Sequence, residues 1–226
     1  MLSPCVAQQG AIAPPAETST HHSNATVPTP SADKIWAGLM AGNQRFVDGK
    51  PLNRESVELR KDLAIGQHPH VVVLACSDSR VPPELLFDQG LGDLFVVRSA
   101  GNIADAIGIG SIEYAVEHLG SSVLVVLGHT GCGAVAAACA AEQMASPSLQ
   151  AMVDKIAPAV AHATKYGKGD ALIEAAIKQN IHQSATDVLA ASEILRHFVE
   201  ERKLVVFEAE YQLNTGKVIR LEGSPD

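Results

Sequence analysis

The sequence predicts an α/β fold with a mainly parallel central sheet and flanking helices, and three observations support this. Short, wholly apolar runs are typical of strands that are buried on both faces of a parallel sheet. These runs alternate with helical patterns, as right-handed crossovers between parallel strands require. The 226 residues, 46% hydrophobic and only 4% aromatic, suffice for one such domain with a full core of aliphatic side chains.

Two helices are expected before the first strand. The first begins at Ser31 or Asp33 and runs to about Asp48, because apolar side chains recur at helical spacing and Gly49 and Pro51 follow. The second covers about residues 54–65. Both helices can pack either on the chain's own sheet or on a partner subunit.

Strands and helices then alternate to the end of the chain. The expected strands are 70–75, 94–97, 122–127, 203–210 and a short final strand, 217–221. The expected helices are a short one in "PPELLFDQG", then 106–119, 131–144, and a long helical region over 148–201 that breaks near "KYGKGD".

Residues 1–31 differ from this pattern and are predicted to be a disordered leader or linker, whereas 32–226 form the domain. The segment is rich in Pro, Ser, Thr and Ala and has no periodicity. It lacks the features of an intact signal peptide, yet such polar spacers also follow removed export signals. The sequence therefore leaves a cytoplasmic and an exported, periplasmic location open.

Charge and hydropathy exclude several partners. The net charge of -8 argues against nucleic acid and anionic membranes. No apolar run approaches the roughly 20 residues of a membrane helix, so no membrane span is expected. The four cysteines are too few and too scattered for a disulfide scaffold, and Cys139, in an Ala-rich helical stretch, is expected to be a small buried hydrophobe. Four histidines are expected to be solvated helix residues: His118, His162, His182 and His197.

Ligand-type side chains follow two of the predicted strands. The first strand leads into Cys76, Asp78 and Arg80, and the third into "GHTGCG", which supplies His129 and Cys132. Ligands of open α/β sheets bind beyond the carboxyl ends of the strands, so these residues are expected to meet in space. Two thiolates and an imidazole suit Zn²⁺, and three protein ligands leave a fourth position open, which is the pattern of catalytic zinc.

Asp78 has two competing partners. It lies two residues from Cys76, so an extended backbone points both side chains to the same side and makes Asp78 a candidate fourth ligand. Arg80 lies another two residues along and can hold a carboxylate with two hydrogen bonds. If Arg80 holds Asp78, the metal keeps an open position, and if Asp78 binds the metal, the site is closed.

The residues alone leave three interpretations open. An isolated Cys or His-x-x-Cys is more often part of a hydrophobic core. Structural zinc sites usually have two closely spaced pairs of Cys or His ligands, and this sequence has only one such pair. Catalytic zinc, structural zinc and no metal therefore remain as alternatives, and only the joint arrangement at two strand ends favours the first.

The sequence resembles the β-class carbonic anhydrases. The resemblance lies in "ACSDSRVPPELLFDQGLGDLFVVRSAGN", "GSIEYAVEHLG", "VLGHTGCGAV" and "YQLNTGKV", which match family blocks in order and spacing across about residues 33–222. It implies a parallel sheet with an antiparallel edge strand and an N-terminal helical arm that embraces a neighbour. The chain would then form a homodimer or a higher homo-oligomer.

The resemblance also implies the chemistry. It makes Cys76, His129 and Cys132 the ligands of one Zn²⁺ per chain, with Asp78 joining them in a closed form. The reaction is the reversible hydration of CO₂ to bicarbonate by zinc-bound hydroxide, oriented by an Asp78–Arg80 dyad. The backbone N–H of Gly133 is a candidate donor to a substrate oxygen.

Two other functions remain in view. Hydrolysis of CS₂ or COS shares this metal site within the family, and a catalytically silent, zinc-stabilised binding protein belongs to another class. Retention of Asp78 and Arg80 argues against the silent protein, because a purely structural metal site needs neither. Arg98 matches an arginine of an allosteric bicarbonate pocket in some family members, but other pocket positions differ here, so Arg98 can serve structure alone.

Overall fold

Five strands form one sheet in the order β2-β1-β3-β4-β5. The computed structural model describes residues 30–52 and 57–222, so residues 1–29 of the predicted leader lie outside the described residues. The first four strands run parallel, and β5 is antiparallel to β4, as expected. The strands are β1 (Val71–Cys76), β2 (Leu94–Ser99), β3 (Val123–His129), β4 (Val205–Tyr211) and β5 (Val218–Arg220).

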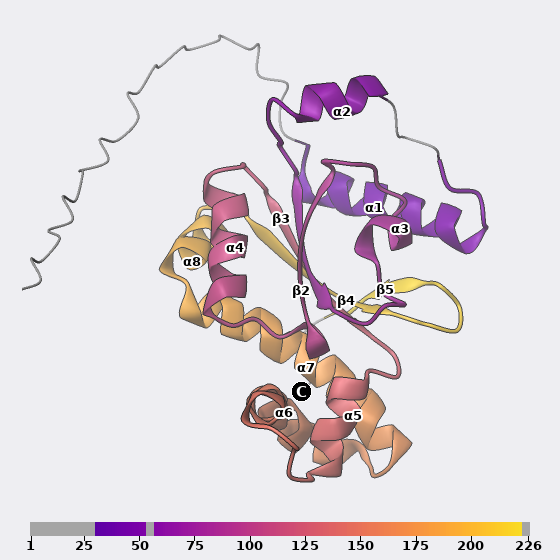
Figure 1. Ribbon diagram of the computed structural model, residues 1–226, viewed down its shortest axis with the longest axis vertical. Helices are drawn as coiled ribbons and strands as arrows, with labels where there is room; N and C mark the ends of the chain where they lie inside the picture. The colour runs from indigo at the N-terminus through magenta and orange to yellow at the C-terminus, as the bar shows by residue number, and fades with distance from the viewer. Residues whose placement is uncertain (1–29, 53–56, 223–226) are drawn as a thin grey trace, which may run out of the picture.

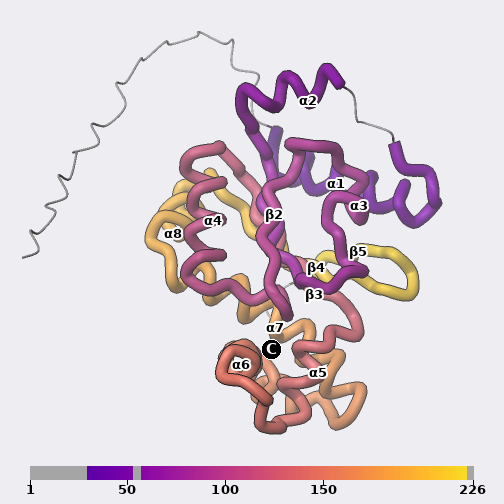
Figure 2. Tube along the Cα trace, in the orientation of Figure 1, coloured from indigo at the N-terminus to yellow at the C-terminus, as the bar shows by residue number. Residues whose placement is uncertain are grey.

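Helices cover both faces of the sheet (Figure 1). Helices α1 and α3 lie on one face, α4, α7 and α8 lie on the other, and α5 and α6 gather beyond the carboxyl ends of the parallel strands (Figure 2). The helices are α1 (Ala32–Val47), α2 (Val57–Leu63), α3 (Pro83–Leu86), α4 (Ala106–Glu117), α5 (Gly133–Ala140), α6 (Pro147–Ala163), α7 (Asp170–Ala191) and α8 (Glu193–Glu200), with 3₁₀ turns η1 (Ala100–Asn102) and η2 (Thr164–Tyr166).

Alternation along the buried strands divides the core in two. In β1, Val72 and Leu74 pack toward α4–α8, whereas Val71 and Val73 pack toward α1 and α3. Every residue of β1 and β3 is buried. Wholly apolar strands are needed here because both faces of the central sheet are covered.

Several element boundaries differ from the expected ones for local reasons. Helix α5 ends at Ala140 rather than near 144, because Ala141 adopts a left-handed backbone with φ of 54°. The break near "KYGKGD" is confirmed, since Gly167 and Gly169 have φ of 149° and 59°. The region after it breaks again at Ser192, whose side chain accepts a hydrogen bond from Leu195 N and caps α8. Only 57–63 of the expected second helix is helical among the described residues.

Helix α1 packs on the chain's own sheet. Trp36 and Leu39 join the core on that face, and the Trp36 ring lies 4.9 Å from the Phe207 ring of β4, centroid to centroid. Buried Asn43 adds polar ties: its Nδ2 donates to the carbonyls of Leu86 (3.0 Å) and Gly216 (2.9 Å), and its Oδ1 accepts from Val218 N (2.9 Å). These bonds satisfy the buried amide and join α1 to α3 and to β5.

Gly42 allows α1 to approach α3 closely. A Cβ built on Gly42 would lie 1.8 Å from the Phe87 carbonyl oxygen, which is backbone and cannot turn aside. Gly38, one turn earlier on the same helix, has no atom within 4 Å of its own Cβ position. Only Gly42 of these two glycines therefore lies where a side chain would clash with a neighbouring element.

We expect Gly42→Ala to lower the free energy of unfolding by about 1–3 kcal/mol, because the added methyl group must push α1 away from α3. Gly38→Ala is the matched control and should raise it by about 0.5–1 kcal/mol through helix propensity. Urea unfolding of both variants measures the difference. Equal stabilities for the two variants would contradict the close approach.

Candidate metal centre

Two strand ends and a helix start bring three ligand-type side chains together. Cys76 is the last residue of β1, His129 the last of neighbouring β3, and Cys132 the N-cap residue of α5. Their ligand atoms all lie within 4.8 Å of one another, and all three residues are buried. Within the described part of the chain, no other group of three or more such side chains is placed to hold a metal ion.

A tight turn between β3 and α5 aims His129 and Cys132 at the same point. Gly131 adopts φ of 65°, a left-handed backbone that glycine reaches without strain. Thr130 fastens the turn to the end of β4: its N–H donates to the Tyr211 carbonyl (3.0 Å), and its Oγ1 accepts from Leu213 N (3.1 Å). The third strand thus extends two residues beyond the expected end and carries His129 itself.

His129 presents one ring nitrogen to the two sulfurs. Its Nδ1 lies 3.0 Å from the Thr130 carbonyl oxygen, which can only accept, so Nδ1 carries the proton. The buried Nε2 is left as an acceptor and has no hydrogen-bond partner among the described residues. A buried unpaired nitrogen is costly unless a metal ion binds it, so this orphaned atom fits a metal site.

The two sulfurs also fit a cation. The Cys76 and Cys132 side chains share a hydrogen bond, which is the main cause of opposite shifts: the pKa of Cys76 falls to about 4, and that of Cys132 rises far above its usual range. Two thiolates cannot lie this close without positive charge between them, so the pair retains one proton. Burial lowers the pKa of His129 and the Cys76 thiolate raises it, with a net upward shift. A divalent cation would displace the thiol proton and pair with both thiolates and with Nε2 of His129.

Asp78 is held by Arg80 beside this cluster. Arg80 Nε donates to Asp78 Oδ1 (2.9 Å), Nη2 donates to Oδ2 (2.7 Å), and the Arg80 backbone N–H donates to Oδ1 (2.9 Å). These bonds hold the pKa of Asp78 well below its usual range. Asp78 Oδ2 lies 3.8 Å from His129 Nε2, near the cluster but outside the three-ligand group. The structure therefore pairs Asp78 with Arg80 through three hydrogen bonds.

Arg98 has a role at the site that the sequence does not reveal. It lies on β2, and its guanidinium reaches across to the end of β1, where Nε donates to the Cys76 carbonyl (3.0 Å) and Nη2 to the Asp78 carbonyl (2.7 Å). Ser77 N also donates to the Ser99 carbonyl (2.9 Å), so the turn after β1 is fastened to β2. No motif spacing signals this contact, because the register of the sheet creates it.

The other singled-out residues have varied surroundings. Gly133 is the exposed first residue of α5, and no atom lies within 4 Å of its Cβ position, so a small ligand has room there. Cys139 is half-buried and packs on the edge of the core rather than within it. His182 differs from the solvated residue expected: its Nδ1 lies 3.0 Å from Glu208 Oε1, so α7 contacts β4 through this pair.

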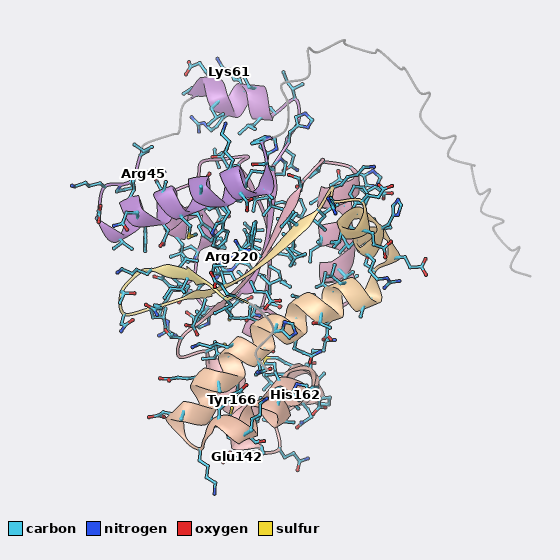
Figure 3. The ribbon with its side chains drawn as sticks, turned by 180° about the vertical axis from the view of Figure 1, so that it is seen from behind. Arg45, Lys61, Glu142, His162, Tyr166 and Arg220 are labelled. Atoms are coloured by element: carbon cyan, nitrogen blue, oxygen red, sulfur yellow. The ribbon has the colours of Figure 1, made fainter. Side chains whose placement is uncertain are left out.

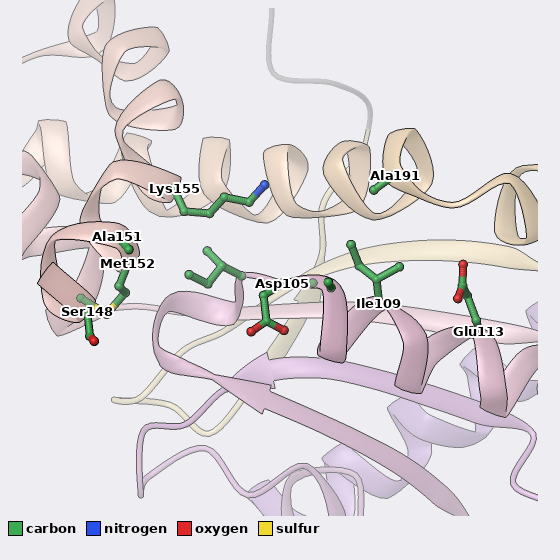
Figure 4. A pocket seen from close by; sticks show the side chains of 11 residues that line it. Asp105, Ile109, Glu113, Ser148, Ala151, Met152, Lys155 and Ala191 are labelled. Carbon is green, nitrogen blue, oxygen red and sulfur yellow. The ribbon is translucent and has the colours of Figure 1, made fainter.

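The cavity in Figure 4 is separate from the metal cluster. It has a volume of about 710 Å³ and lies between the start of α4, α6 and the end of α7. None of Cys76, His129 or Cys132 lines it. Its polar walls are already bonded: Lys155 pairs with Asp187 and Glu113 accepts from Ser192. The metal cluster therefore remains the candidate functional site.

Comparisons with known proteins agree with this site. The sequence profile of the carbonic anhydrase family matches residues 71–218. Carbonic anhydrase 2 of Mycobacterium tuberculosis is 38% identical over 199 residues, which cover 85% of this chain and 94% of the relative. The carbonic anhydrase of Pseudomonas aeruginosa is 33% identical over 176 residues, covering 74% and 80% of the two chains.

Solved structures show the same fold. The β-carbonic anhydrase CcaA superposes with a TM-score of 0.68 at 27% identity, covering 84% of this chain and 89% of its own. A tetrameric β-carbonic anhydrase from Sordaria macrospora gives a TM-score of 0.65 at 25% identity, with 84% and 93% covered. Profile, relatives and fold agree, so this chain belongs to the β-carbonic anhydrase family of enzymes.

Proposed function

We propose that this chain is a zinc-dependent carbonic anhydrase that catalyses the reversible hydration of CO₂ to bicarbonate. The observation that carries the proposal is the combination of three buried ligand-type side chains with a carboxylate that Arg80 holds beside them. A structural metal site needs no such carboxylate. The family and the names of the relatives support the same reaction.

The donor set favours zinc over other cations. Two thiolates and one imidazole are soft to borderline ligands, which suit Zn²⁺ and not Mg²⁺ or Ca²⁺. Cys76, His129 and Cys132 would hold the ion. The bound ion would supply a Lewis acid that lowers the pKa of a coordinated water toward neutrality.

Asp78 would orient the reacting water. Because Arg80 keeps the carboxylate ionised, Asp78 can accept a hydrogen bond but cannot donate one. Its Oδ2, on the His129 side, would take the bond from the water and leave a water lone pair directed at the carbon of CO₂. The Gly133 backbone N–H, at the open start of α5, would donate to a substrate oxygen.

Metal stoichiometry tests the ligand set. We expect the purified chain to hold one zinc per chain and Cys132→Ser to hold far less, because a hydroxyl binds zinc weakly at neutral pH. Cys139→Ser is the matched control and should keep one zinc, since Cys139 packs away from the cluster. Elemental analysis measures both. Equal zinc contents in the two variants would contradict the assignment.

Stopped-flow hydration of CO₂ tests the role of Asp78. We expect Asp78→Asn to lower kcat about tenfold to a hundredfold, because the amide NH₂ that replaces Oδ2 donates instead of accepting and loses the bond from Arg80 Nη2. Zinc content should remain at one per chain. A variant with wild-type turnover, or a zinc-loaded wild type without CO₂ hydration at any pH, contradicts the mechanism. Turnover of COS or CS₂ instead would favour the hydrolase.

We also propose that the chain works as a homodimer or a higher oligomer. No side chain of α2 is fully buried, and Val57 on the helix and Leu52 and Ile65 beside it are exposed by 50%, 53% and 90%. A seven-residue helix is not stable alone in water, so a partner that covers α2 would explain its presence. The Sordaria macrospora relative, described as tetrameric, supports this proposal.

Sedimentation tests the assembly. We expect wild type to sediment at twice 23.7 kDa or a higher multiple and Ile65→Glu to shift toward the monomer, because it places a charge on the exposed apolar surface just after α2. Tyr166→Glu is the control. Figure 3 places Tyr166 at the end of the molecule opposite Lys61 of α2, so the change should leave assembly unaltered. A wild-type monomer would contradict the proposal.

A further inference from the structure

One residue, Gly101, connects the metal cluster to the long helix α7. Its backbone N–H donates to Cys76 Sγ at 3.3 Å, and its carbonyl accepts from Asn180 Nδ2 at 2.7 Å. Asn180 lies on α7, 79 residues farther along the chain. Asn180 is therefore linked to the Cys76 sulfur through a single intervening residue, Gly101.

The direction of the Gly101 N–H depends on an unusual backbone conformation. Gly101 has φ of 75° and ψ of 21°, and a Cβ here would lie 2.8 Å from Ile156 Cδ1 and 3.3 Å from Ala134 Cβ. Only glycine fits this conformation in this space. The bond from Asn180 fixes the carbonyl on one side of Gly101, which in turn fixes the direction of the N–H on the other side.

Packing alone does not explain the amide of Asn180. The residue is 1% exposed, and its Oδ1 has no hydrogen-bond partner among the described residues. The amide cannot be turned round, because the Gly101 carbonyl only accepts and so requires Nδ2. The amide pairs with the buried Gly101 carbonyl and also contacts Asn102 Oδ1 at 3.5 Å, yet it leaves its own oxygen without a partner, so its donors and not its oxygen explain an Asn here.

The next residue continues the same polar network. Asn102 is also buried and has φ of 48°, a left-handed backbone that is uncommon outside glycine. Its Nδ2 donates to Ser184 Oγ at 3.4 Å, one helical turn beyond Asn180 on α7. Thus α7 supplies two polar side chains to η1, but only the Asn180 contact includes the residue whose N–H reaches Cys76.

We propose that Asn180 is a positioning residue that holds the Gly101 N–H on the Cys76 sulfur and so sets the electron density that this sulfur donates to a bound metal. Groups of this kind, one step outside the ligands, typically change metal affinity or activity about 10- to 100-fold when removed. The inference rests on the proposed metal site, and it adds a residue on α7 that no ligand motif includes.

Two variants and one control test the role. Asn180→Ala removes the donor, and Asn180→Leu removes it while keeping a side chain of similar size. We expect both to bind zinc about 10- to 100-fold more weakly in a chelator competition. In Co²⁺-substituted protein, the sulfur-to-cobalt absorption band should move to longer wavelength, because a sulfur without the N–H contact holds its electrons less tightly. Ser184→Ala, one turn along α7, should change neither.

The outcomes separate this inference from the proposed function. Wild-type zinc affinity and an unmoved cobalt band in both Asn180 variants would overturn the inference while leaving the metal site intact. An equal loss in Ser184→Ala would overturn it too, because the effect would then come from general packing of α7. A wild type that binds no zinc would instead overturn the proposed function.

A measurement on the wild type avoids any dependence on how the variants fold. In protein loaded with ¹¹³Cd, the Gly101 amide proton should show scalar coupling to the metal through the N–H···S contact. No coupling at Gly101, with the other amides near the cluster assigned, would overturn the inference. Coupling that persists at full size in Asn180→Leu would overturn the positioning role of Asn180.

Discussion

The parallel register of β1 and β3 is the constraint on which the site depends. Val71 pairs with Val123 and Ala75 with Leu127, so the two strands end side by side and bring Cys76 and His129 to one edge of the sheet. A slip of one residue would turn every side chain of a strand to the opposite face. Because both faces are packed with apolar side chains, such a slip is strongly opposed. The hydrophobic core, which includes Cys76 and Cys132, thus fixes the geometry of the site.

Beyond the strand ends, the residues of the site are held in place by hydrogen bonds from other parts of the chain and not by the sheet itself. Arg98 fastens the carbonyls of Cys76 and Asp78, Arg80 holds the Asp78 carboxylate, and Asn180 fixes Gly101. Each donor comes from a different stretch of chain. These bonds hold the turns that follow the strands, so the carboxylate and sulfurs of the site have defined partners before any substrate arrives.

Much of this could be predicted from the sequence, for identifiable reasons. Apolar runs marked β1 and β3 because fully buried strands need them, and the His129–Cys132 spacing marked a tight turn because both ligands fall within four residues. Arg98 and Asn180 could not be assigned roles, since their contacts arise from register and from helix packing across 20 and 79 residues. The contact of His182 with Glu208 escaped prediction for the same reason, and so did the left-handed end of α5 at Ala141.

Asn43 has a consequence for how the chain is made. Two of its three hydrogen bonds reach Gly216 and Val218, 173 and 175 residues farther along. During synthesis on the ribosome the chain emerges from its N-terminus, so α1 must wait for nearly all of the sheet before its buried amide is satisfied. Until then the apolar face of α1 has no finished surface to cover. Cotranslational folding therefore cannot complete this layer early, because the buried amide of α1 is satisfied only once the β4–β5 hairpin has formed.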